Sequence, residues 1–504
     1  KGERISLLNA DSLMYDESIA PGAQRLSGNV HFLHKGMHLF CDSAVLYERK
    51  QIFMAFGNVK MEQGDTLSLI GEFMRYDGNT LIAEVRNNVV MTHRDQVLIT
   101  DSLNYDRLYA MGYYFEGGEL LDGENVLTSD WGEYYTTTRK ATFNYDVQLE
   151  NKKFTLTSDT LHYDTQTKWA NVLGPSHIIS GKSKVYTECG YYNSETEQMK
   201  LYDRSVLHNE GKKMVGDSIF YDKANGMMTG CDNVEYEDKE NHNIVMGEYC
   251  RYEENRGYAI AYGRALVKDF SNPKDTLFVH ADTLEMFSYH LDTDSVFRTM
   301  HAYFHVRAFR TDVQAVCDSL VGLSREKKMI LYRDPIVWSA NRQILGEVIS
   351  VYSNDSTIDS VYVEHQALMA EQVDSLHFNQ VSGDLMRAYF DSNGDIRENR
   401  VDKNVYVVYY PLEKDSLLLY QNYTETSKLR MFMENRKMKR LWSPAAEGSF
   451  YPIGMAPPER TILQGFSWFD YVRPRDKYDL YEWRPKKKGS ELKASVRRVA
   501  PLQN

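Results

Sequence analysis

The chain has 504 residues, of which 42% are hydrophobic and 26% are charged. This composition excludes an intrinsically disordered chain, and the sequence has no run of 18 apolar residues that could cross a bilayer as a helix. The 59 basic and 71 acidic residues give a net charge of −12, which argues against a dedicated nucleic-acid-binding protein. Tyrosine is in surplus, with 36 Tyr against 21 Phe, and this favours extensive β-sheet.

A short strand-like pattern, D-[ST]-L-x-Y-D, recurs from the N-terminus onward. Good copies occupy residues 11–16, 101–106, 159–164 and 217–222, and weaker copies lie between and after them. Six consecutive steps between the marking tyrosines are 29 residues long. Such a unit is too short to bury its apolar face alone, so the repeat predicts a stack of β-units. The marking tyrosines are Tyr15, Tyr47, Tyr76, Tyr105, Tyr134, Tyr163, Tyr192, Tyr221 and Tyr252.

A second landmark lies between the tyrosines. G-N-V or a related triplet occurs at residues 28–30, 57–59, 87–89 and 232–234, and we expect each to open a short apolar-alternating strand. Tight-turn dipeptides separate the runs, so each unit is predicted to be strand, turn, strand, turn. These dipeptides are Lys35-Gly36, Asp77-Gly78, Asn225-Gly226 and Asn393-Gly394.

The repeat loosens after Tyr252, and this predicts three parts. Residues 1–268 form a regular array, residues 275–441 a second and irregular β array, and residues 442–504 a Pro-rich, basic C-terminal extension. Residues 470–504 carry ten Lys or Arg against five Asp or Glu. We interpret this extension as an arm that docks to a partner, with a solvated, disordered terminus as the alternative.

Motifs for catalysis, nucleotide binding or metal binding are incomplete. Gly181-Lys182-Ser183 lacks the first glycine of a phosphate-binding loop, and a strand-like run follows it. His31, His34 and His38 cannot converge on one metal if they flank a hairpin, and His301 and His305 are too far apart along a strand. The sequence therefore predicts no catalytic residues, no metal site and no cofactor. The five scattered cysteines are expected to be mostly buried free thiols.

The repeated Asp and Tyr admit two interpretations. They could form a ladder of carboxylates and phenols for calcium or sugar. The favoured interpretation is architectural, with Asp as a turn or strand-entry residue and Tyr packed on the neighbouring unit with its hydroxyl at the rim. A feature present in every unit is more typical of architecture than of a site.

These strands and triplets resemble the OstA-like, or LptA, family of lipopolysaccharide-transport proteins. The resemblance is clearest from Asn9 to Ala265 and weaker to Leu441. It implies an all-β stack, an antiparallel β-jellyroll shaped like a taco, whose apolar groove holds the acyl chains of lipopolysaccharide. It also implies a periplasmic bridge from the inner membrane to the outer-membrane translocon, with end-to-end pairing of open edge strands and no catalysed reaction. We expect a signal peptide to have been removed.

One face of the repeat is the candidate groove lining. Sealed-core packing of the same side chains is an equal alternative. A polysaccharide-binding adhesin or a polysaccharide-active enzyme of β-solenoid type is the alternative function. The candidate residues are Leu13, Val30, Val59, Leu103, Leu161 and Ile219.

Overall fold

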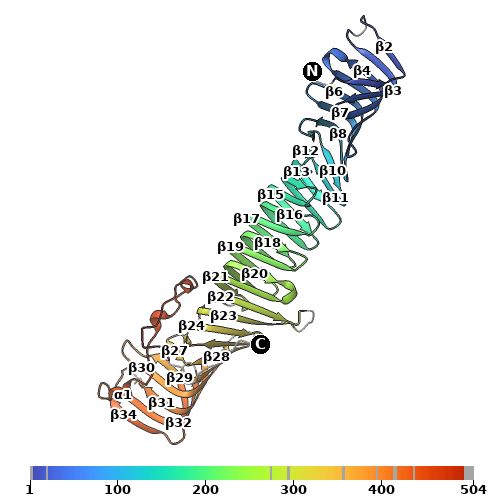
Figure 1. Cartoon of the computed structure of the whole chain (residues 1–504). Helices are drawn as coiled ribbons and strands as arrows, with labels where there is room; N and C mark the ends of the chain where they lie inside the picture. Colours follow the sequence, from blue (N-terminus) through green and yellow to red (C-terminus); the bar gives the residue numbers. More distant parts are fainter. Residues whose placement is uncertain are drawn as a thin grey trace. The chain divides into compact units, whose positions relative to one another are not determined.

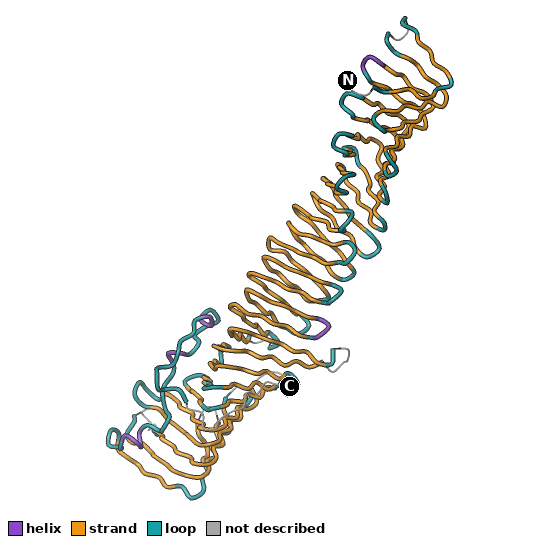
Figure 2. The backbone as a smooth tube through the Cα atoms, viewed as in Figure 1, coloured by secondary structure: helices purple, strands orange, loops and turns teal. Residues whose placement is uncertain are grey.

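A computed structural model describes residues 4–18, 21–272, 275–291, 296–354, 358–392, 395–411, 417–434 and 437–492. These residues form antiparallel strands almost throughout, which confirms the predicted all-β class (Figures 1 and 2). The chain divides into two compact units, Lys1–Met228 and Thr229–Asn504. The predicted division at residues 268–275 and at residue 442 stays a prediction. No helix in the described ranges is long and apolar enough to cross a membrane.

Consecutive strands of the first unit pair as hairpins, and β9 to β12 are short pieces of two split strands. Strand β19 (Met227–Asp238) contains the boundary between the units. The strands of the first unit are β1 (Ser6–Asn9), β2 (Ser12–Tyr15), β3 (Gln24–His34), β4 (Met37–Tyr47), β5 (Ile52–Gln63), β6 (Leu67–Asp77), β7 (Ile82–His93), β8 (Gln96–Asp106), β9 (Met111–Tyr114), β10 (Gly118–Asp122), β11 (Asn125–Ser129), β12 (Trp131–Tyr135), β13 (Lys140–Glu150), β14 (Phe154–Asp164), β15 (Trp169–Ser180), β16 (Ser183–Asn193), β17 (Gln198–Asn209) and β18 (Lys212–Asp222).

The second unit continues in the same manner, and one short α-helix, α1 (Pro458–Thr461), and two 3-10 turns, η3 (Asp470–Val472) and η4 (Asp479–Tyr481), follow its last strand. Its other strands are β20 (Asn243–Glu253), β21 (Tyr258–Asp269), β22 (Leu277–Tyr289), β23 (Phe297–Phe309), β24 (Gln314–Leu323), β25 (Lys328–Tyr332), β26 (Ile336–Ser339), β27 (Arg342–Leu345), β28 (Val348–Ser353), β29 (Ile358–Gln372), β30 (Phe378–Phe390), β31 (Ile396–Tyr409), β32 (Tyr420–Glu434), β33 (Lys437–Trp442) and β34 (Glu447–Pro452).

Most of the alternate long strands bend at a pair of residues in the left-handed region. In β5 these are Gly57 (φ 71°) and Asn58 (φ 44°), and the pairing of β4 with β5 shifts register there. The Asn58 Nδ2 donates to Asp42 Oδ2 on β4 at 2.9 Å. Two strand residues thus oppose one, as in a β-bulge, and the strand changes direction. The G-N-V triplet therefore lies in the middle of a long strand, whereas the sequence placed it at the start of a short one.

The bend divides the sheet into two facing layers. Layer A contains strand halves such as residues 52–56, and layer B contains halves such as residues 59–63. The inward-facing rings of Phe32 in layer B and Phe53 in layer A stack at 4.7 Å, which shows that the layers pack on each other. The core of each unit consists of such alternate, inward-facing apolar residues. We call the side opposite the bends the mouth, because the layers there are not joined by the strands.

The two aspartates of the repeat have different roles. The first lies at the bend, where Asp11 accepts from Asn29 Nδ2 at 2.9 Å, as Asp42 does from Asn58. The second ends the strand and caps the hairpin turn: Asp106 Oδ1 accepts from the backbone N–H of Leu108 at 2.8 Å. The turns at 35–36, 77–78 and 225–226 are confirmed, and Asn393-Gly394 lies outside the described residues.

Residues 453–492 form a strap over the second unit. Leu463, Phe469 and Val472 of the strap are buried against layer B, in a cluster that contains Val316 and Trp338. By strand alternation these two residues point away from the interior, so the strap covers the outer face of the layer. The described part of the predicted extension thus packs on its own unit, and residues 493–504 lie outside the described residues.

Buried glutamines of layer B hold the backbone of the strap. Gln343 Nε2 donates to the Ser467 carbonyl, and its Oε1 accepts from the Phe469 N–H, both at 2.8 Å. Gln380 makes the same two kinds of contact, with the Thr461 carbonyl and the Leu463 N–H, at 3.0 Å each. The strap joins no sheet here, so these side chains satisfy backbone groups that would otherwise be buried without partners.

We expect Gly57→Ala to destabilise the first unit more than Gly64→Ala does. Both glycines have positive φ, but a Cβ at Gly57 would lie 2.6 Å from Asp42 Oδ2, whereas nothing lies within 4 Å of one at Gly64. An alanine at positive φ should lower the free energy of unfolding by about 1 kcal/mol in both variants. The close contact with Asp42 should lower it by about 1–3 kcal/mol more in Gly57→Ala alone. Urea unfolding of both variants measures the difference, and equal loss would contradict the proposed fit at the bend.

We expect Phe469→Ala to destabilise the second unit by about 3–5 kcal/mol, since the ring is 2% exposed and its removal leaves a cavity. Tyr478→Ala is the control, because that strap residue is 76% exposed. The urea midpoint of the second unit is the measurement, and an unchanged midpoint for Phe469→Ala would show that the strap does not hold its layer.

Candidate functional site

The interior between the two layers is the place where a long apolar ligand would bind. The structure places five of the six predicted groove residues there, each at most 1% exposed. Leu13 is 53% exposed, because β2 is an edge strand that pairs with β3 alone among the described strands. A role of these residues in lining a lipid groove stays a prediction. The five interior residues are Val30, Val59, Leu103, Leu161 and Ile219.

Repeat tyrosines close the mouth of the first unit. Tyr76 and Tyr134 project from layer A, and their hydroxyls lie 2.8 Å from Nδ1 of His34 and His93 in layer B, respectively. The hydroxyls are therefore buried and bonded across the mouth. The sequence had placed them at the rim of each unit.

A buried carboxylate continues the closure in the next repeat. Asp122, 2% exposed, accepts from Tyr163 Oη at 2.8 Å, Gln96 Nε2 at 3.0 Å and Lys168 Nζ at 2.6 Å. Burial and the Asp122 charge both raise the pKa of Tyr163, so its phenol stays neutral and able to donate. A charge buried in this way is stable only with such partners.

Part of the mouth of the second unit is lined mainly by apolar side chains. A cavity of about 60 Å³ lies between its layers, with Val279, Ala315 and Val337 on layer B and Leu331 and Val361 on layer A. No tyrosine–histidine or tyrosine–aspartate bond crosses between the layers among the residues that line it.

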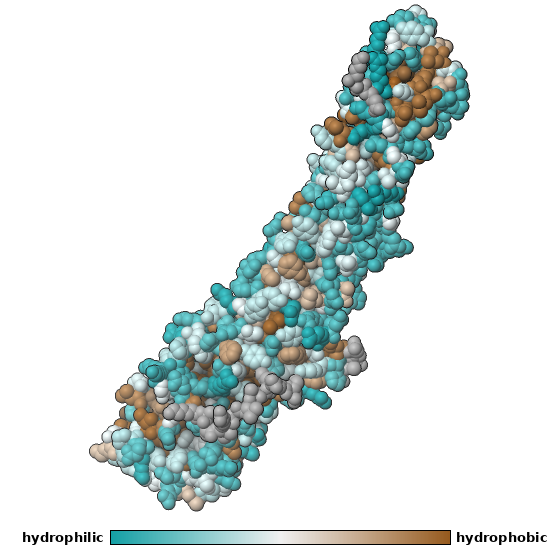
Figure 3. Space-filling view, viewed as in Figure 1, coloured by the Kyte–Doolittle hydropathy of each residue, from teal (hydrophilic) through white to brown (hydrophobic). Residues whose placement is uncertain are grey.

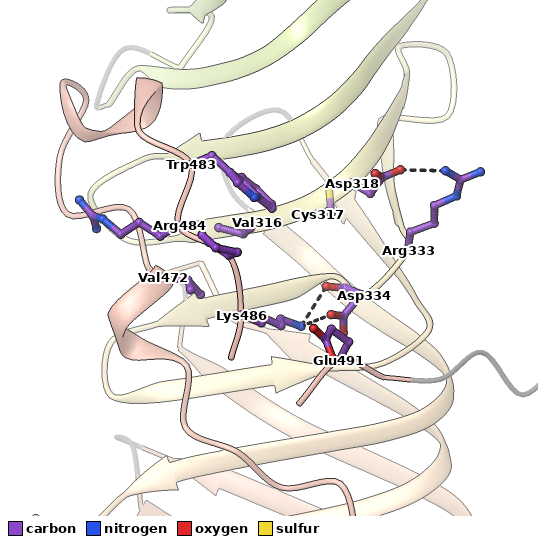
Figure 4. A pocket seen from close by; sticks show the side chains of 11 residues that line it. Val316, Cys317, Asp318, Arg333, Asp334, Val472, Trp483, Arg484, Lys486 and Glu491 are labelled. Carbon is purple, nitrogen blue, oxygen red and sulfur yellow. Dashed lines mark hydrogen bonds and ion pairs between the residues drawn. The ribbon is translucent and has the colours of Figure 1, made fainter. Parts of the chain in front are cut away.

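A larger cavity, about 260 Å³, lies under the strap (Figure 4). Its charged side chains neutralise each other: Arg333 pairs with Asp318 at 3.2 Å and Lys486 with Asp334 at 2.6 Å. Burial lowers the pKa of Lys486, and the Asp334 charge opposes that shift. Arg484, which also lines the pocket, pairs with Asp479, so each of its three cations already has an anionic partner.

In the described ranges, no group of three or more His, Cys, Asp or Glu is arranged to hold a metal ion. His31 Nε2 and His38 Nδ1 lie 3.0 Å apart on one face of the hairpin, whereas His34 points into the core. The hairpin prediction placed the three side chains in this way. The five cysteines are free. Burial raises the pKa of Cys41 to about 12, which leaves that thiol unreactive near neutral pH.

The family model of OstA-like proteins matches residues 2–159, so this part of the chain is an OstA-like domain. The resemblance drawn from the repeats is thereby confirmed over these residues. Among solved structures, the chain is similar to the crystal structure of LptH, described as the LptA homologous periplasmic component of the conserved lipopolysaccharide transport device from Pseudomonas aeruginosa. The identity is 16%, over 26% of this chain and 75% of that chain, with a TM-score of 0.14. No curated protein matches the chain.

Sequence reasoning missed the residues that close the mouth. His34 and His93 lie 42 and 41 residues from their tyrosine partners, more than one repeat away. A usable signal was present, because a polar residue ends an otherwise apolar run just before each layer B turn. The apolar cavity of the second unit had no such signal, since its lining residues come from strands of irregular spacing.

We expect the first unit to lose stability in acid through His93. Burial and the charges of Arg94 and Arg139 lower the pKa of His93 from 6.5. As the pH falls, His93 therefore takes up a proton in the unfolded chain before it does so in the folded one. Its contribution to the free energy of unfolding is complete above about pH 6.5 and declines below it. The urea midpoint at pH 7.5 and at pH 5.5 measures this, with the exposed His162→Gln as control. His93→Gln, which keeps a polar side chain, should reduce the decline, and an unchanged decline would exclude this histidine as its source.

Proposed function

We propose that the protein is a periplasmic lipopolysaccharide-binding bridge, which carries lipopolysaccharide from the inner membrane toward the outer-membrane translocon through the interior between its layers. The OstA-like match over residues 2–159 supports this proposal. In this proposal the chain binds and passes on a lipid and catalyses no reaction.

The observation that carries the proposal is an apolar interior that is covalently closed on one side only. Strands join the layers at the bends, whereas side chains alone hold them at the mouth. Separating the layers at the mouth therefore breaks no ladder hydrogen bond. Each methylene group that an acyl chain buries inside contributes about 0.8 kcal/mol, so the bound chain can offset the side-chain packing that separation removes. The apolar cavity of the second unit is our candidate entry point for such a chain.

Exposed edge strands support the proposed assembly. Among the described strands, β1 and β2 pair only with β3, and Leu8, Leu13 and Met14 there are more than half exposed. Figure 3 shows apolar surface gathered over these first strands. At the other end of the described strands, β33 and β34 pair only with β32. Unpaired edges of this kind are templates for another strand. We propose that they join a second copy or the membrane components of the transport system.

Photo-crosslinking in cells tests the proposal. A diazirine amino acid at Leu103, Leu161 or Leu331 faces the interior, and one at Ile179, 48% exposed, is the outward control. We expect lipopolysaccharide adducts from the interior positions and not from residue 179.

Mass spectrometry of an organic extract of the purified protein is the second measurement, with lipid A as the expected species. Adducts from residue 179 alone, or a lipid-free protein that takes up no added lipopolysaccharide, would contradict the proposal. Adducts from Leu331 but not from Leu103 would restrict the path to the second unit.

A further inference from the structure

We propose that two guanidinium groups at the mouth of the first unit, Arg107 and Arg139, bind the phosphate groups of an amphiphile whose chains lie in the interior. The inference rests on the proposed function and adds to it the chemistry of the head group. It concerns only residues of the first unit.

Both arginines stand at hairpin turns of layer A that border the mouth. Arg107 follows β8 directly, and its N–H donates to the Leu81 carbonyl at 3.1 Å. Arg139 closes the turn before β13, where its φ is 58° and its N–H donates to the Tyr135 carbonyl at 2.8 Å. Backbone hydrogen bonds thus fix the base of each side chain on the rim of the interior.

Arg107 reaches across the mouth to neutral acceptors. Its Nε donates to Gln63 Oε1 at 3.0 Å, its Nη1 to Tyr76 Oη at 2.7 Å and its Nη2 to the Lys35 carbonyl at 3.0 Å. Gln63 and Lys35 belong to layer B. The guanidinium forms no ion pair within the described residues, so its positive charge is solvated by dipoles only.

The guanidinium of Arg139 has fewer hydrogen bonds than that of Arg107. Its Nη2 lies 3.5 Å from Gln96 Oε1, and its Nε is buried and has no hydrogen-bond partner. The charges of Arg139 and Arg94 act on His93, and this places a second cation beside the same mouth. A buried guanidinium N–H without an acceptor is unfavourable, and an anion entering the mouth would remove that penalty.

The next cations along the rim are already neutralised. Lys168 pairs with the buried Asp122 at 2.6 Å, and Lys223 pairs with Glu197. Of these four cations of layer A, Arg107 and Arg139 are the two for which the described residues provide no ion pair. Their hairpins are neighbours, two strands apart, which corresponds to about 10 Å along the ladder. Guanidinium forks match phosphate oxygens in bidentate geometry, and two forks can hold two phosphates of one head group.

The test compares lipid A that carries two phosphates with the same lipid A after dephosphorylation. Binding of each to the full chain is measured for the natural sequence, for Arg107→Gln/Arg139→Gln and for the control Lys152→Gln, an exposed lysine on another turn. We expect the double variant to lose roughly tenfold or more in affinity for the phosphorylated lipid and nothing for the dephosphorylated one. We expect the control to match the natural protein.

A second variant, Arg107→Lys/Arg139→Lys, keeps the positive charges but lacks the bidentate donor geometry of guanidinium. It should recover part of the affinity for the phosphorylated lipid. Its urea midpoint and that of the Gln variant report whether the mouth still folds. Titration with inorganic phosphate separates the two sources of the anion: no binding below millimolar concentration indicates a lipid head-group site, and tight binding indicates a free-phosphate site instead and overturns the head-group assignment.

Failure of this inference is distinct from failure of the proposed function. If the natural protein binds both lipids equally well, or if the Gln variant binds the phosphorylated lipid as the natural protein does, the phosphate assignment is overturned while lipid binding stands. If the natural protein binds neither lipid, the proposed function fails and the assignment falls with it.

Discussion

The fold depends on one backbone event, the bend in most of the alternate long strands. At most bends two consecutive residues take positive φ, and in the first repeats a carboxylate of the neighbouring strand accepts a hydrogen bond from the second of them, as Asp42 does from Asn58. An antiparallel meander without such bends would leave both its faces in water. The bend turns the inner halves of the strands toward each other, so that Phe32 and Phe53 can stack and a core can form from a sheet alone. A non-glycine residue at positive φ costs about 1–3 kcal/mol, and burial of the facing layers offsets this at each repeat.

The bend also determines where the structure is weakest. It joins the layers covalently on one side, so the mouth depends on side chains alone. The first unit uses buried polar contacts there, including the three bonds to Asp122, and such contacts lose much of their value if one partner is removed. The second unit has a cavity at its mouth that is lined mainly by apolar side chains. The two mouths are therefore held by different interactions, which are buried polar contacts in the first unit and mainly apolar packing at the cavity of the second.

The sequence predicted the repeat, the all-β class and the hairpin turns, because a period of 29 residues and the turn dipeptides are local signals. It did not show that Gly57-Asn58 bends a strand, since a bulge leaves the alternation on both of its sides intact. It could not place His34 beside Tyr76, because that contact joins different repeats across the interior. Leu13 matched the inward pattern and is nevertheless exposed, because it lies in an edge strand with a single neighbour. The alternation of apolar and polar residues along a strand predicts which way a side chain points. Whether that side chain is buried depends on the strands that lie next to it and face it.

The strap adds an asymmetry that composition did not reveal. Prolines and basic residues suggested a free arm, yet Gln343 and Gln380 bind its backbone and Phe469 is buried beneath it. Layer B of the second unit is consequently packed on both faces, by the strap outside and by the cavity-lining residues inside. Layer A has no such cover among the described residues. An apolar chain that enters the cavity therefore meets one wall that is held from behind and one that is free to yield. The strap thus supports the wall that contains Ala315 and Val337, and it does not support the wall that contains Leu331 and Val361.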